Sequence, residues 1–429
     1  MKRIGALLLV FSLLSAFVFA NGDGESTQTI TLRMLTRTAG ADPAVPLWED
    51  AIAEFQALHP EVIIQDDSVN QEAAYSNIIK TGFATGNLPN FFYDGGTVGM
   101  VKYAKEGVIQ DISPAFDDAE WYNGFAEGTF DNWKFDSFGA PGYYAFPHAM
   151  SPEAIVYNKK LFAQAGIEKT PETWNELLVA IDQLNAAGIV PWEMGGAALW
   201  RTGHLHNYIM YKWCGVQKAI DLGTRQAKWT DSDVVETFQF IKDLKARGAF
   251  RENFEGLDYD MEKSLFLAGE SAMVLNGVWF AGEVSALENS EDFGTFHFPY
   301  FEEKPEFKGH MVCYPEGYYV KAGMDEEELA LTIEFLKLWT SKKIQARKVK
   351  ELKMLSPRVD LGLTSEDLNE VLVGYSAVFS DSTMLGSDIA SYDPLSEVGD
   401  QARNSVIGML LGQSAEEAAA SVQAVIDNN

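Results

Sequence analysis

The chain has 429 residues, more than one compact core usually serves, so two domains are expected. Its composition, 47% hydrophobic and 22% charged, is typical of a soluble globular protein. A net charge of -29 argues against a nucleic-acid partner and against binding to an anionic membrane surface. The aromatic content of 12% either enlarges the core or lines a ligand cleft.

The first twenty residues have the pattern of a secretory signal peptide. Lys2 and Arg3 precede an apolar run over 4–19, and small residues before the cut allow cleavage after Ala20. A membrane anchor is the alternative, but the run is short for a span. No cysteine lies near the cut, which disfavours a lipid anchor. The sequence therefore predicts an exported mature chain that is free of the membrane.

The N-terminal third alternates strand and helix patterns. An apolar stripe at helical spacing marks the first helix, which opens at Asp42 and Pro43. The β-α-β-α-β order predicts a mixed or parallel sheet with helices on its faces. In chain order, the predicted elements are a strand at 29–35, a helix from 42 to 58, a strand at 62–65, a helix at 75–86 and a strand at 90–94.

The rest of the chain continues in this style and becomes mainly helical toward its end. Stretches rich in aromatic residues, glycine and proline at 93–99, 139–152, 195–204 and 312–318 are predicted as loops that line a site. The predicted strands lie at 153–158 and 272–275, and the predicted helices at 159–166, 170–188, 232–247, 325–339, 342–352, 395–411 and 415–427.

Motifs for phosphate loops, zinc-protease helices, hydrolase elbows and dinucleotide binding do not occur, so no cofactor is predicted. His204 and His206 are candidate metal ligands, but on a helix they point to different faces and no third ligand is near, so no metal is predicted. Cys214 and Cys313 either form a disulfide or remain two separate buried thiols, and the sequence leaves both open. Carboxylates such as Asp94, Glu153 and Glu316 also leave open a secreted glycoside hydrolase, which needs two such groups.

Several stretches together resemble the extracellular solute-binding proteins of ABC transporters, in the sugar-binding class that includes maltose-binding protein. In chain order they are "FATGNLPNFFYD" (83–94), "IVYNKKLFAQAGIEKTPETWNELLVAIDQLNAAGIVP" (155–191), "GESAMVLNGVW" (269–279) and "GYYVKAG" (317–323) with the helix and "TSKKIQ" after it. Asn90 stands where the family usually has Asp. The resemblance covers nearly the whole mature chain.

The resemblance implies an α/β protein with two hinged lobes, each a sheet flanked by helices, between which the chain crosses three times. The crossings are expected near 149–152, 297–300 and 353–357. Lobe 1 is then 27–150 plus 299–353, and lobe 2 is 151–298 plus 356–429. The ligand is expected in the cleft between the lobes.

The resemblance also points to ligand-binding residues. Trp279 matches the family's cleft tryptophan, which packs against a sugar ring, although a buried lid on its own lobe is the alternative. Trp200 matches a region that supplies a second aromatic ring. "YPEG" (314–317) replaces a glycine-rich family stretch. The predicted ligand-binding residues are Arg37, Asp94, Tyr144, His148, Trp200, Trp279, Tyr314, Glu316 and Gly317.

The sequence therefore predicts a periplasmic, monomeric binding component that delivers a mono- or oligosaccharide to an ABC permease in the inner membrane, without catalysis. A non-sugar solute is the alternative within the binding class, and the secreted glycoside hydrolase is the alternative outside it. The sequence does not name the sugar.

Overall fold

The computed structural model describes residues 29–95, 98–126, 129–364 and 367–429, and the predicted signal peptide lies outside these ranges. Within them, nine strands form one mixed sheet. The strands are β1 (Ile30–Leu35), β2 (Val62–Asp66), β3 (Phe91–Asp94), β4 (Ala145–Asn158), β5 (Val190–Trp192), β6 (Ser271–Gly277), β7 (Phe293–Phe296), β8 (His310–Val320) and β9 (Met384–Gly386).

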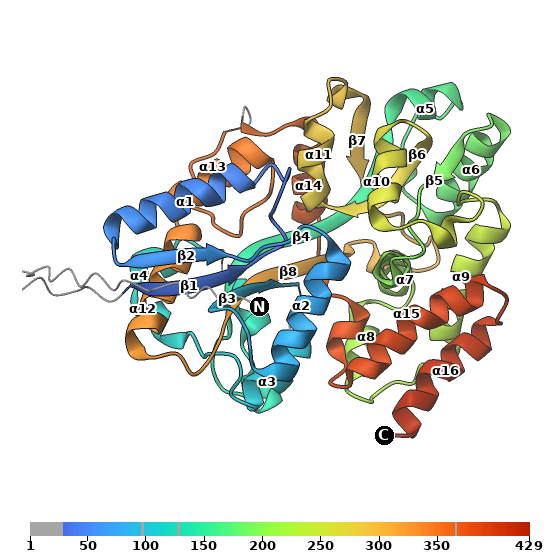
Figure 1. Ribbon diagram of the computed structural model, residues 1–429. Helices are drawn as coiled ribbons and strands as arrows, with labels where there is room; N and C mark the ends of the chain where they lie inside the picture. Colours follow the sequence, from blue (N-terminus) through green and yellow to red (C-terminus); the bar gives the residue numbers. More distant parts are fainter. Residues whose placement is uncertain (1–28, 96–97, 127–128, 365–366) are drawn as a thin grey trace, which may run out of the picture.

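The helices cover both faces of the sheet on each side of the molecule (Figure 1). They are α1 (Val45–Leu58), α2 (Glu72–Thr85), α3 (Val101–Lys105), α4 (Ala119–Tyr122), α5 (Lys159–Gln164), α6 (Trp174–Ala186), α7 (Leu199–Trp213), α8 (Val216–Gly223), α9 (Ser232–Ala246), α10 (Tyr259–Leu267), α11 (Ala281–Ser285), α12 (Glu326–Trp339), α13 (Lys342–Leu352), α14 (Glu370–Ser380), α15 (Ser396–Leu410) and α16 (Ala415–Asp427). Two short 3₁₀ turns also matter for the site, η6 (Val278–Phe280) and η10 (Ile389–Tyr392).

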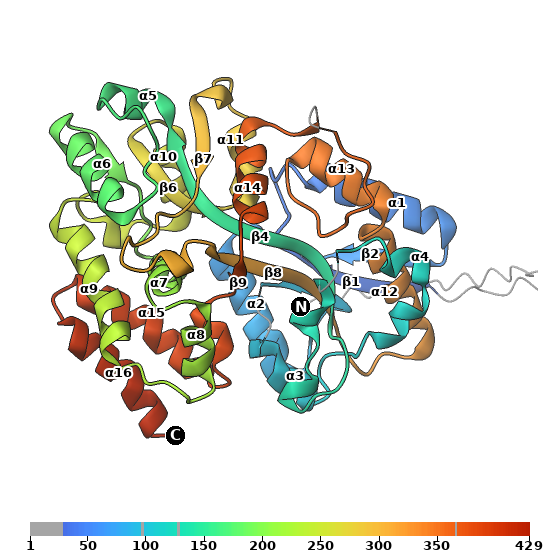
Figure 2. The same cartoon turned by 180° about the vertical axis from the view of Figure 1, so that it is seen from behind.

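The chain folds into two lobes, which lie side by side in Figures 1 and 2. The strand order is β2-β1-β3-β8-β4-β6-β5, with β7 on β4 and β9 on β8. In one lobe β1 pairs in parallel with β2 and β3, and in the other β5 pairs in parallel with β6. The predicted α/β fold with two lobes, each built on a sheet flanked by helices, is confirmed.

Two long strands, β4 and β8, belong to both lobes and run across the middle of the molecule (Figure 2). The first half of β4 pairs with β8, from Ala145 to Pro152, and its second half pairs with β6 and β7, from Glu153 onward. A β-bulge interrupts β4 between Pro147 and Ala149, just before this change of partner. A bulge bends its strand and increases the local twist, which helps β4 to turn from one lobe into the other.

Each lobe has its own buried core. One hydrophobic cluster gathers β1, β3, α1 and α12, with Trp48 stacked on Trp339 at 3.4 Å between ring centroids. A larger cluster gathers β6, α6, α7, α9 and the C-terminal helices. Phe301, expected in lobe 1, packs against Trp174 and Trp213 in this second cluster. The lobe boundaries stay a prediction, and this packing favours a second crossing within β8 over one at 297–300.

The structure leaves both cysteine side chains free, Cys214 half-buried and Cys313 buried, so they form no disulfide with each other. Among the described residues, none of the helices combines the length and the apolar character that a membrane span needs.

Candidate functional site

Four aromatic side chains from different parts of the chain meet at one edge of the second lobe, and we call them the aromatic platform: Trp200, Tyr259, Trp279 and Tyr314. Ring centroids are 4.8 Å apart for Trp200 and Tyr259, 6.4 Å for the two tryptophans and 6.2 Å for Trp279 and Tyr314. The Trp279 indole N–H donates to the Tyr259 hydroxyl at 2.8 Å. Both tryptophans are half-buried, so each keeps apolar surface that a ligand can contact.

Local structure explains how the platform forms. Trp200 is in the first turn of α7, and Tyr259 begins α10 directly after Asp258, whose side chain caps the helix by accepting from the Met261 N–H at 2.8 Å. Trp279 is in η6, which follows β6 without a gap. Gly277 permits this tight entry, because a Cβ atom there would lie 2.1 Å from the Trp279 ring.

The two histidines of α7 have separate partners. His204 accepts or donates through Nδ1 at 2.7 Å from Glu153, and its ring stacks on Tyr314 with centroids 4.4 Å apart. His206 is bonded through Nε2 to the Thr237 hydroxyl at 2.8 Å, and burial lowers its pKa to about 3. The described residues hold no group of three side chains suited to a metal ion. His204 therefore belongs to the support of the platform.

A polar cluster lies where β3, β4 and β8 adjoin in the first lobe: Tyr93, His148, Glu316, Tyr318 and Lys348. The Tyr93 hydroxyl donates to Glu316 at 2.6 Å, and the Tyr318 hydroxyl is 2.9 Å from Nδ1 of His148. Lys348 donates to the backbone oxygen of His148 at 2.8 Å. Burial lowers the pKa of Lys348 to about 7 and holds the pKa of His148 well below its usual value. The cluster therefore combines a neutral imidazole, two tyrosine hydroxyls, one amine whose pKa lies near neutrality and one carboxylate.

The strand β8 connects the platform with this polar cluster. Tyr314, Glu316 and Tyr318 occupy alternate positions of β8, and alternate residues of a strand point to the same face of the sheet. The other face is closed at Gly317, where a Cβ atom would lie 2.9 Å from Ala145 and 3.1 Å from Trp133. An aromatic surface and a set of hydrogen-bonding groups thus follow each other along one face of the strand that joins the lobes.

Arg37 and Asp94 lie at the ends of β1 and β3, as expected, and both are half-buried. The Asp94 residue pairs with Gly317 across the sheet, and its charge raises the pKa of Tyr75 after the larger effect of burial. Within the described residues, the buried Nε of Arg37 has no hydrogen-bond partner. Ligand contact stays a prediction for Arg37 and Asp94.

Two predicted residues have other neighbours. Tyr144 stacks on Phe135 with centroids 5.1 Å apart, and its hydroxyl donates to the backbone oxygen of Pro141 at 3.2 Å. It lies in a third hydrophobic cluster, apart from the one that Trp279 packs against. Gly317 is required by the close approach of Trp133. Ligand contact stays a prediction for both.

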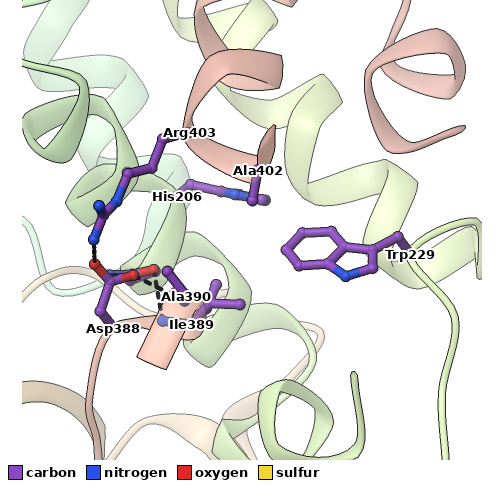
Figure 3. A pocket seen from close by; sticks show the side chains of 9 residues that line it. His206, Trp229, Asp388, Ile389, Ala390, Ala402 and Arg403 are labelled. Carbon is purple, nitrogen blue, oxygen red and sulfur yellow. Dashed lines mark hydrogen bonds and ion pairs between the residues drawn. The ribbon is translucent and has the colours of Figure 1, made fainter. Parts of the chain in front are cut away.

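A small cavity in the second lobe is lined by residues that include His206, Trp229 and Asp388 (Figure 3). It measures about 10 Å³, room for about one water molecule, and is lined by α7, η10 and α15. Asp388 and Arg403 form an ion pair at its wall, and Asn207 donates both to Asp388 at 3.3 Å and to the Tyr314 hydroxyl at 3.1 Å. Burial raises the pKa of Asp388, but Arg403, together with smaller contributions that include the Ala390 backbone N–H, outweighs this and holds the pKa at about 2. The cavity is too small for a sugar and belongs to the support of Tyr314.

Sequence reasoning did not find four members of the platform and the polar cluster: Tyr93, Tyr259, Tyr318 and Lys348. Tyr259 begins a helix that the sequence pattern did not reveal, and the buried Lys348 lies in a helix whose bounds were predicted but whose buried face was not. Their burial follows from contacts between elements far apart in the sequence, which single-sequence periodicity does not report.

The comparison with protein families identifies the chain. Residues 40–346 match the model of the bacterial extracellular solute-binding proteins, and the chain belongs to that family. An sn-glycerol-3-phosphate-binding periplasmic protein of Brucella melitensis biotype 1 is 28% identical over 216 residues, 47% of this chain and 46% of that protein. The matched part of this chain thus spans about half the length of that curated relative. A multiple sugar-binding protein of Streptococcus mutans serotype c is 21% identical over 308 residues, 70% of each chain.

Solved structures show the same fold. A chitin oligosaccharide binding protein superposes with a TM-score of 0.85 at 23% identity, covering 93% of this chain and 98% of that one. A maltose-bound MalE3 of T. maritima superposes with a TM-score of 0.74 at 17% identity, covering 93% and 100%. At these identities the similarity establishes the architecture.

Proposed function

We propose that this protein is the binding component of an ABC importer and takes up a carbohydrate between its lobes. The observation that carries the proposal is the aromatic platform, in which two half-buried tryptophans lie 6.4 Å apart beside Tyr259 and Tyr314. The apolar C–H face of a pyranose fits the electron-rich face of an indole. The polar cluster on the same face of β8 supplies acceptors and donors for sugar hydroxyls, which would remain unpaired with the wrong ligand.

Each lobe supplies a different kind of contact to the ligand. The platform holds the sugar on the second lobe, while Glu316, His148, Arg37 and Asp94 meet its hydroxyls from the first. A ligand that touches both lobes favours the closed arrangement, and a shift from mostly open to mostly closed takes a difference in affinity of about 5.5 kcal/mol. The permease recognises the closed form, so closure couples binding to delivery. The protein acts as a monomer, without nucleic acid and without turnover of the sugar.

Relatives support this class of ligand. Their names include a multiple sugar-binding protein and a maltotriose-binding protein, and one solved neighbour holds raffinose. Other relatives are named for sn-glycerol 3-phosphate, which is a polyol phosphate. The aromatic platform favours a ring-shaped neutral ligand over that small anion, because stacking requires a flat apolar face.

Export to the periplasm through a cleaved signal peptide completes the proposal. Cleavage after Ala20 removes Lys2 and Arg3 and changes the net charge from -29 to -31, since residues 1–20 contain no acidic side chain. The intact mass of protein recovered from the periplasm should match a chain that begins at Asn21. A lipid-modified or uncleaved N-terminus would contradict this part of the proposal.

A thermal-shift screen tests the function. The panel contains maltotriose, raffinose, chitotriose, xylotriose, galactose and sn-glycerol 3-phosphate, since a ligand that binds the folded chain raises its melting temperature. At least one sugar should raise it, should reduce the radius of gyration in small-angle scattering, and should be recovered intact. Binding of sn-glycerol 3-phosphate alone would refute the sugar assignment. Breakdown of the sugar would favour the glycoside hydrolase, and an unchanged scattering profile at saturation would exclude closure.

A further inference from the structure

The guanidinium of Arg201 lies beneath the aromatic platform and is 1% exposed. It is the third residue of α7 and reaches back between β6 and α10. Nε donates to Glu262 at 2.9 Å, Nη1 to Glu153 at 3.4 Å, and Nη2 to the backbone oxygen of Leu275. Burial alone would lower the pKa of Arg201, but Glu262 and Glu153 outweigh it and raise the pKa, so the side chain stays charged.

The same cation stacks on two rings of the platform. The guanidinium carbon lies 4.6 Å from the Trp200 ring centroid and 5.3 Å from that of Tyr259. Tyr259 in turn accepts the Trp279 indole N–H. On the other side, Glu153 joins Arg201 to His204, whose ring stacks on Tyr314. One buried ion-pair network thus reaches all four rings of the platform.

We propose that Arg201 is the positioning residue of the aromatic platform and fixes the mutual angle of Trp200 and Trp279 before the ligand arrives. This inference rests on the proposed function, because it assigns how the same site is held in its binding geometry. A guanidinium is planar and holds two carboxylates in a fixed fork while it stacks on aromatic faces, and a lysine ammonium does neither. Rings that are ordered in advance lose less freedom when the sugar binds.

The variant Arg201→Lys tests the proposal because it keeps the charge and removes the planar stack. The matched control is Arg251→Lys in the same lobe, where Nη2 of Arg251 lies 2.8 Å from the fully buried Glu193. Within the described residues, Arg251 stacks on no aromatic ring. Both variants lose a two-pronged ion pair, so both should lower the melting temperature. Only Arg201→Lys also removes a guanidinium that stacks on rings of the platform.

Two readouts separate positioning from mere stability. Calorimetric titration with the tightest sugar of the panel should show affinity about tenfold weaker for Arg201→Lys and unchanged for Arg251→Lys. Circular dichroism without ligand should show a changed coupling signal of the Trp200 and Trp279 pair in the first variant only. Unchanged affinity and an unchanged tryptophan signal in a folded Arg201→Lys protein would overturn the proposal.

A further variant covers a failure to fold. If Arg201→Lys is unfolded, Arg201→Gln combined with Glu262→Gln removes Arg201 together with its closer carboxylate, while Glu153 keeps His204 as a partner at 2.7 Å. Its tryptophan signal should change in the same way, and a wild-type signal with wild-type affinity would again refute the role of Arg201. If no sugar of the panel binds the unaltered chain, the proposed function fails while the ligand-free tryptophan signal still decides whether Arg201 orders the rings.

Discussion

Replacing Trp279 by alanine decides whether this ring is a binding surface or a lid on the core. The ring is half-buried, packs on Gly277 and donates its N–H to Tyr259 at 2.8 Å. A fully buried Trp→Ala change costs about 3–5 kcal/mol of stability, so a half-buried ring should cost roughly 2 kcal/mol. Independently of stability, loss of a stacked aromatic ring at the centre of a binding site weakens binding by about 2 kcal/mol, which is roughly thirtyfold in affinity.

The matched control is Trp213→Ala at the far end of α7. Trp213 is also half-buried, and its N–H donates to Glu236 at 2.8 Å. Urea unfolding should show a similar loss of stability for both variants, while calorimetric titration with the tightest sugar should show weaker binding for Trp279→Ala alone. Equal affinities for both variants would mean that Trp279 is a lid, and the platform interpretation would be wrong.

Two further predictions concern stability. Thr173→Ala should lower the free energy of unfolding by about 1 kcal/mol in urea, because it breaks the capping box in which Glu176 N–H donates to the Thr173 hydroxyl at 3.3 Å; an unchanged midpoint would contradict this. Burial gives Lys348 a pKa of about 7 in the folded chain, against an ordinary value of 10.5. Between these two pH values the unfolded chain binds one more proton than the folded chain, so the free energy of unfolding rises with pH. Urea unfolding from pH 7 to 10 should show a free energy of unfolding that rises with pH less steeply in Lys348→Met, by about 1.4 kcal/mol per pH unit, and a wild-type slope would refute the lowered pKa of Lys348.

Much of the fold could be predicted because helices carry their signals locally. The bounds of α13 and α16 equal the predicted 342–352 and 415–427, and α9 and α12 differ by one residue. Caps and apolar stripes lie within a few residues of one another and do not depend on the rest of the chain. Of the stripe in α1, only Leu58 is largely exposed, at 66%, since it lies in the last turn beyond the cover of the sheet.

The prediction of loops at 139–152, 195–204 and 312–318 was wrong in large part. The structure has β4 from Ala145, α7 from Leu199 and β8 across the third stretch. These segments contain Pro147, Pro152 and Pro315, which normally indicate breaks. The bulge in β4 absorbs an irregular register next to Pro147, and pairing with β8 supplies the tertiary contacts that override local preference.

The site, like the fold, could be predicted only in part. Family resemblance brought Trp200 and Trp279 to attention, and the structure places their rings 6.4 Å apart. The groups that support them were hidden, because Glu262 is 61 residues from Arg201 and pairs with it only after the lobe has folded. Burial of a charge is decided by what packs around it, and the sequence alone shows only its type.

Any movement of one lobe relative to the other must deform the two strands that the lobes share. β4 changes partner from β8 to β6 at Glu153, a residue that also holds Arg201 and His204 under the platform. β8 carries Tyr314 of the platform and Glu316 of the polar cluster two residues apart. A change in the angle between the lobes must bend or twist these strands, and the same bending alters the distance between the platform and the polar cluster. The ligand contacts proposed on both sides of β8 would therefore act directly on the strands that determine the lobe angle, and this is the differential interaction that the proposed closure requires.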